Sequence, residues 1–78
     1  MNKETILYED YTDEELIRYI IDNKLKKGDR ILMEQFMKCG CIKRVLAIRL
    51  KSSKYIVDKE INRIMFLIYI QFKKIKNI

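Results

Sequence analysis

The chain has 78 residues, enough for one domain, with a net charge of +6 and 49% hydrophobic residues. It has no proline and two glycines, which disfavours a sheet-rich domain because strands of this size need more turn residues. It has no histidine, the side chain most often used in acid–base catalysis, and no phosphate loop, nucleophile elbow or metal motif. We therefore expect an all-α binding protein without catalytic residues or a cofactor.

The charge is distributed unevenly along the chain. Residues 1–22 carry seven acids and two bases, whereas residues 23–54 carry ten bases and two acids. Such asymmetry is typical of proteins that meet nucleic acid, or that meet a protein which does. A lysine-rich composition from an AT-rich genome would give the same net charge, so charge alone does not choose between these explanations.

The sequence predicts a cytoplasmic protein without a membrane segment. Cys39 and Cys41 are one residue apart, and a disulfide between them would close a strained ring. A zinc site needs about four ligands, so we expect two reduced thiols, at least one of them in a core. The acidic N-terminus lacks the pattern of a signal peptide. The longest apolar run, residues 64–70, is too short to span a bilayer.

The predicted fold is a compact bundle of about four helices. Residues 1–11 lack helical periodicity and are expected to form a flexible acidic arm ahead of one helical domain at 12–78. Thr12 starts the first helix, because Glu15 three residues later completes a capping box. Gly28 is expected to end this helix. Its apolar face is formed by Leu16, Ile17, Ile20, Ile21 and Leu25.

Two shorter helices are expected next. Asp29 can cap the second, which ends at Gly40, and the third runs from about Cys41 to Lys51. Residues 52–54 form a polar break. The apolar face of the second helix is Leu32, Met33, Phe36 and Met37, and that of the third is Ile42, Val45, Leu46, Ile48 and Leu50, with Ala47 between them.

The last helix is expected to begin at an Asp58 cap and to run nearly to the C-terminus. It is apolar around most of its circumference, so it should be the central core helix. Three short helices are too few to cover it, which predicts a spare hydrophobic strip. A β-strand over residues 64–72 is the alternative. The expected core seam is Ile61, Met65, Leu67 or Ile68, Phe72 and Ile75.

The second helix, Gly40 and the third helix have the outline of a helix-turn-helix. The fit is poor, because Phe36 falls where a small residue is usual, and Gln35 and Arg49 fall where apolar residues are usual. Basic residues around the third helix can contact phosphates, or they can form a solvated face. These six candidate nucleic-acid-binding residues are Lys38, Lys43, Arg44, Arg49, Lys51 and Lys54.

Residues 13–75 resemble region two of bacterial RNA polymerase sigma factors of the extracytoplasmic-function type. The resemblance is carried by DEELIRYI at 13–20, Gly28-Asp29, RVLAIRL at 44–50, EINRIMFL at 60–67 and the later Phe72. It implies that the last helix docks on the clamp coiled coil of the polymerase largest subunit. It also implies a stand-alone module that works with a second protein, because the family continues beyond FKKIKNI into its promoter-melting segment.

The resemblance assigns roles to residues of the last helix. Glu60 matches the acidic position of the family, Arg63 replaces a glutamine, and Phe66 matches the core phenylalanine. We expect the partner-binding surface on the exposed side of 59–70, formed by Glu60, Arg63, Phe66 and Leu67. Charge reversal at Glu60 or Arg63 is expected to weaken binding with little change in melting temperature.

Three functions are therefore open. The first is a transcription accessory protein that docks on RNA polymerase and places a basic face near DNA. The second is a small phage or mobile-element inhibitor that binds another host protein. The third is a dimeric helix-turn-helix DNA-binding repressor. The expected partners are RNA polymerase or another host protein, DNA, and a co-sigma protein or a second copy of the chain.

Overall fold

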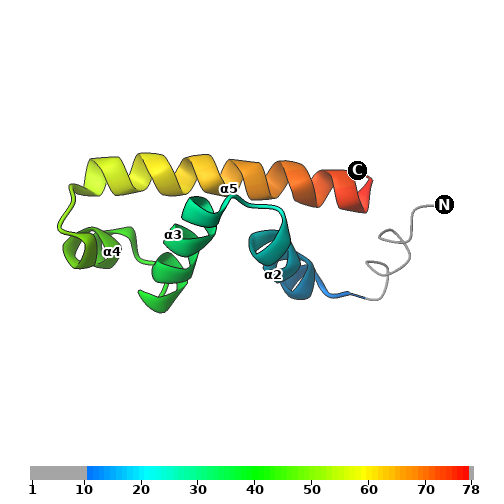
Figure 1. Ribbon diagram of the computed structural model, residues 1–78, viewed down its shortest axis with the longest axis horizontal. Coiled ribbons are helices and arrows are strands. Elements are labelled where there is room, and N and C mark those ends of the chain that lie inside the picture. Colours follow the sequence, from blue (N-terminus) through cyan, green and yellow to red (C-terminus); the bar gives the residue numbers. More distant parts are fainter. Residues whose placement is uncertain (1–10, 78) are drawn as a thin grey trace.

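The computed structural model describes residues 11–77, and within them it contains four α-helices and no strand. The helices are α2 (Asp13–Asn23), α3 (Lys27–Lys38), α4 (Lys43–Leu50) and α5 (Lys54–Lys76). The three short helices pack against one side of the long α5 in a molecule of 46 × 19 × 18 Å (Figure 1). The predicted all-α bundle is confirmed, and the alternative of a strand over residues 64–72 is wrong. The predicted arm at 1–11 lies outside the described residues except for its last residue.

One apolar core joins α5 to all three short helices. The buried residues of α5 are Val57, Ile61, Ile64 and Ile68, whose spacing of three and four places them in one stripe along the helix. The predicted central position of this helix is confirmed. Met65 of the predicted seam is exposed, because Ile64 faces the short helices in its place. The other buried residues are Leu16, Ile20, Ile21, Met33, Phe36, Cys39, Leu46 and Ala47.

The start of α2 is fixed by the predicted capping box. The backbone N–H of Glu15 donates to Thr12 Oγ1 at 3.2 Å, and the backbone N–H of Thr12 donates to Glu15 Oε1 at 3.0 Å. Two amide groups that the first turn leaves unpaired are thereby satisfied. The hydrogen bonds from Thr12 lower the pKa of Glu15, so this end of the helix is most stable with Glu15 ionised.

Three predictions of helix ends are wrong: Gly28 as the end of the first helix, Asp29 as the cap of the second and Asp58 as the cap of the last. Gly28 does not end the first helix, because α2 already ends at Asn23, and both Gly28 and Asp29 lie in the first turn of α3. Asp58 does not cap α5, because this helix begins a turn earlier, where Ser53 Oγ accepts from the backbone N–H of Ile56 at 3.1 Å. Asp29 and Asp58 instead bind bases on other helices, so their roles are tertiary.

The turn between α3 and α4 is built on left-handed backbone. Gly40 has a φ of +69°, as its predicted place after a helix requires. Cys41 has a φ of +60°, which delays the start of α4 from the predicted Cys41 to Lys43. Cys39 is buried and Cys41 is exposed, and both thiols are free, as expected. Lys51, at +54°, ends α4 in the same conformation.

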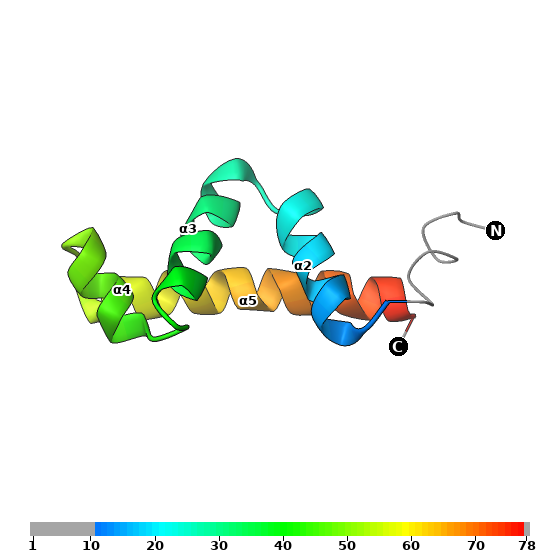
Figure 2. The ribbon, with the colours of Figure 1, turned by 90° about the horizontal axis from the view of Figure 1, so that it is seen from below.

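The predicted apolar face of the third helix is wrong in most positions. Only Leu46 and Ala47 of α4 are buried, whereas Ile48 is 73% exposed. The cause is that the apolar residues of α4 are spread around its whole circumference, at about 100° per residue, while only one side of this short helix packs against α5 and α3. Figure 2 shows α4 lying against the start of α5. None of the helices within residues 11–77 is both long and apolar enough to cross a bilayer. The other exposed residues of the face predicted for the third helix are Ile42, Val45 and Leu50.

Candidate partner-binding site

The four predicted partner-binding residues lie together in the middle of α5. Glu60, Arg63 and Leu67 follow a spacing of three and four, which places them on one side of the helix, with Phe66 beside them. Phe66 is 60% exposed, so the core position that the resemblance implies for it is wrong, and Leu67 is also exposed. We call these four residues the docking face. It presents an aromatic and an aliphatic side chain next to an ion-paired arginine.

Arg63 links α5 to the start of α3. Its Nη2 lies 2.8 Å from Asp29 Oδ1 and its Nη1 lies 3.2 Å from Oδ2, which is a two-point hydrogen bond. Its Nη2 also lies 3.2 Å from Glu60 Oε1. The hydrogen bonds that the guanidinium donates lower the pKa of Asp29, and donating to Asp29 and Glu60 raises the pKa of Arg63. Arg63 therefore has a structural role that the sequence did not indicate.

This ion pair makes stability depend on pH. Because the pKa of Asp29 is lower in the folded chain than its usual value of about 3.9, the pair stabilises the fold above that pH and is lost as pH falls through the folded pKa. The melting temperature of Arg63→Gln should therefore fall less steeply with decreasing pH, below about pH 4, than the melting temperature of the wild type. Arg49→Gln is the matched control, and it should parallel the wild type. Equal slopes for all three proteins would contradict this assignment.

A shallow cavity of about 310 Å³ adjoins the docking face. It lies between α5 and the segment that connects α2 to α3, and its lining mixes charged and apolar side chains. Sequence reasoning missed it, because residues 24–26 were assigned to the first helix. The lining residues are Lys24, Leu25, Lys26, Asp29, Arg63, Leu67 and Gln71.

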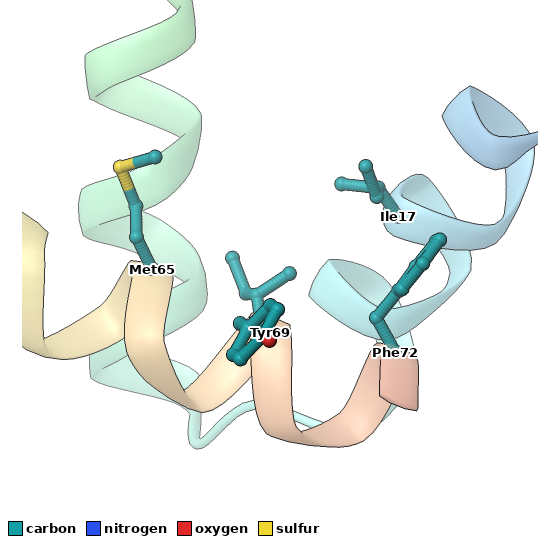
Figure 3. Close-up of a pocket in the computed structure, with 5 residues that line it drawn as sticks. Ile17, Met65, Tyr69 and Phe72 are labelled. Carbon is teal, nitrogen blue, oxygen red and sulfur yellow. The ribbon is translucent and has the colours of Figure 1, made fainter. Parts of the chain in front are cut away.

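A second cavity, of about 300 Å³, is an almost wholly apolar groove between α2 and α5 (Figure 3). Two lysines lie over aromatic rings of this groove. Lys73 Nζ is 5.4 Å from the centre of the Tyr69 ring, and Lys76 Nζ is 5.6 Å from the centre of the Phe72 ring. Sequence reasoning missed this groove as well, because it placed most of the lining in the core. We call it the α2–α5 groove, and it is lined by Ile17, Met65, Ile68, Tyr69 and Phe72.

The six predicted nucleic-acid-binding residues gather at the α4 end of the molecule. Lys43 is already engaged, because its Nζ lies 2.7 Å from Asp58 Oδ1 and 2.8 Å from Asn62 Oδ1, both on α5. The hydrogen bond from Lys43 lowers the pKa of Asp58. Residues 35–57 contain no acid at all. The other five bases are exposed and make no ion pair within residues 11–77: Lys38, Arg44, Arg49, Lys51 and Lys54.

The described residues offer no site for a metal ion, since residues 11–77 contain no group of three or more possible ligands. No family model, no curated protein and no solved structure matches the chain. The resemblance to sigma region two therefore rests on the sequence motifs alone.

Proposed function

We propose that this chain is a transcription accessory module, similar to a stand-alone sigma region two, that docks on RNA polymerase through the docking face of α5. The observation that carries the proposal is the exposure of Phe66, a large aromatic side chain that is 60% exposed in the middle of the longest helix. Exposed aromatic residues that become buried on binding contribute most of the energy of many protein interfaces.

The apolar and charged residues of the docking face are expected to contribute differently to binding. Phe66 and Leu67 supply the apolar contact area that a partner would bury. Arg63 already donates hydrogen bonds to Asp29 and Glu60, so only some of its N–H groups remain to bind a partner. We therefore assign most of the binding energy to Phe66, with Glu60 and Arg63 at the polar edge of the contact.

Replacing Phe66 with aspartate tests this assignment. Phe66→Asp should lower the retention of purified RNA polymerase on the immobilised protein at least about tenfold, equivalent to about 1.4 kcal/mol, because a buried aromatic anchor is lost. Its melting temperature should change little, since the side chain is exposed. Tyr55→Asp is the control, because Tyr55 is 74% exposed on the same helix outside the docking face.

The basic end of the molecule is proposed to lie near DNA in the complex. The double substitution Arg44→Glu and Lys51→Glu should weaken DNA binding and reduce the slope of log affinity against log salt by about two, or about one per phosphate contact. Lys43→Gln should leave that slope nearly unchanged and lower the melting temperature, because Lys43 binds Asp58. Fluorescence anisotropy with duplex DNA over a salt series measures the slope. An unchanged slope in the double variant would refute the contact.

The same measurements separate the other two functions. Binding to DNA without retention of polymerase at low salt would favour the dimeric repressor, whose recognition helix would be α4. Failure to bind either would favour the inhibitor of another host protein. That second candidate is supported by the exposed Phe66, because an apolar docking face suits a protein partner of any kind.

A further inference from the structure

The outer side of α4 is an apolar ridge with basic flanks. At about 100° per residue, Val45 and Ile48 lie opposite the buried Leu46 and Ala47. Ile48 is the more exposed of the two, at 73%. We call Val45 and Ile48, with the three bases beside them, the α4 ridge. The bases are Arg44 and Arg49, on either side of the ridge, and Lys51, the residue that ends α4.

The α2–α5 groove has the opposite shape and lies beside a helix of opposite charge. Its walls are apolar, with Ile17 contributed by α2 and the other side chains by α5 (Figure 3). Asp13 and Glu14 precede Ile17 by four and three residues, so they lie about one turn away on the same side of α2. Both acids are exposed. Asp13 forms an ion pair with Lys76, in which Asp13 Oδ1 lies 2.9 Å from Lys76 Nζ. α2 carries four acids and one base, a formal charge of −3.

From this complementarity we propose that the α4 ridge of one copy docks into the α2–α5 groove of a second copy, so that the chain self-associates head to tail. The ridge is convex and the groove concave, and both are apolar at their centres. The bases of the ridge then approach Asp13 and Glu14 at the α2 edge of the groove, whereas Lys73 and Lys76 lie over the Tyr69 and Phe72 rings at its α5 edge. α4, which carries the ridge, and α2, which forms one wall of the groove, lie toward opposite ends of α5 (Figure 1). Each copy therefore keeps one free ridge and one free groove, and further copies can add.

Other occupants of the ridge fit less well. Pairing two α4 ridges with each other would bring three bases of each copy together, which is repulsive. A DNA backbone would satisfy Arg44 and Lys51 but would leave the central Ile48 without an apolar contact. In the head-to-tail contact, the bases lie near acids and Ile48 has an apolar contact. This contact uses no residue of the docking face, so its test is independent of polymerase binding. It does use Arg44, Arg49 and Lys51, so in one copy self-association and the proposed DNA contact would exclude each other.

The test is to measure molar mass by light scattering across a concentration series. The mean mass of the wild type should rise to at least twice the 9.5 kDa of one chain at high concentration, and it should fall again as salt is raised. Ile48→Asp removes the ridge and Met65→Asp removes the groove, so each variant alone should stay monomeric. Mixed in equal amounts, they share one intact interface and should form a pair of twice the chain mass and no larger.

Ile31→Asp is the matched control for the ridge, because Ile31 is 49% exposed on α3, outside both surfaces, and it should associate as the wild type does. Tyr69→Asp is the second groove variant if Met65→Asp lowers the melting temperature. A wild type that is monomeric at all concentrations overturns the proposal. So does a mixture of the two variants that remains monomeric, since only a head-to-tail contact predicts that they complement one another.

Discussion

Phe36→Ala should lower the free energy of unfolding by about 3–5 kcal/mol, because it empties a large buried site in the core. Phe36 is only 5% exposed, where α3 packs against the rest of the cluster. Such a loss is comparable with the whole stability of many small domains, about 5–15 kcal/mol. Urea denaturation followed by circular dichroism should therefore show the variant largely unfolded at low denaturant concentrations.

Phe72→Ala is a useful comparison. The sequence suggested that Phe72 is as deeply buried as Phe36, but it is only partly buried and lines the α2–α5 groove. The variant should therefore lose clearly less stability than Phe36→Ala. Arg44→Ala, an exposed change, should stay within about 0.5 kcal/mol of the wild type. If Phe72→Ala proved the most damaging of the three, the assignment of the core would be wrong.

Charge reversal at Arg63 should lower the melting temperature more than charge reversal at any unpaired base. Arg63→Glu replaces a two-point hydrogen bond with repulsion from both Asp29 and Glu60. Asp29 is the less exposed partner, with its side chain 15% exposed, so it cannot turn fully to solvent. Thermal melts at neutral pH measure the change. Arg49→Glu is the control, because Arg49 is exposed and has no ion pair within residues 11–77.

Exchanging the two partners separates this pairing from a general effect of charge. The double variant Asp29→Arg with Arg63→Asp restores opposite charges across α3 and α5, so it should recover part of the melting temperature that Arg63→Asp loses. No recovery would mean that the loss in Arg63→Asp does not come from its pairing with Asp29. The expectation that Arg63 can be reversed without effect on folding holds only if the single reversal leaves the melting temperature unchanged.

The parts of the fold that could be predicted depend only on residues close together in the sequence. The Thr12 capping box lies within four consecutive residues, and the stripe of Val57, Ile61, Ile64 and Ile68 follows helical spacing. The boundaries that failed depended on distant partners. Asp29 and Asp58 resemble helix caps in sequence, but each is bound by a base on another helix. Tertiary ion pairs of this kind leave no periodic signal.

The candidate site was predictable in position but not in its internal contacts. Phe66 and Leu67 are exposed on α5, where the excess of apolar residues predicted a spare strip. The partner of Arg63 was not predictable, because Asp29 lies 34 residues earlier in the chain. The α2–α5 groove was missed because a periodic pattern identifies an apolar residue without saying whether a neighbouring helix reaches it. Ile17 and Met65 belong to the pattern but remain exposed.

The position of α5 after the three helices that it joins bears on how the protein is made. α2, α3 and α4 have 11, 12 and 8 residues, lengths at which an isolated helix is marginal in water. Each packs against α5, which leaves the ribosome after all of them. At about 5–20 residues per second, synthesis of α5 takes roughly one to five seconds, and during that time the apolar faces of the earlier helices lack their common support. Folding is therefore expected to be completed only after α5 has left the ribosome, and until then the apolar faces of the three short helices can bind chaperones.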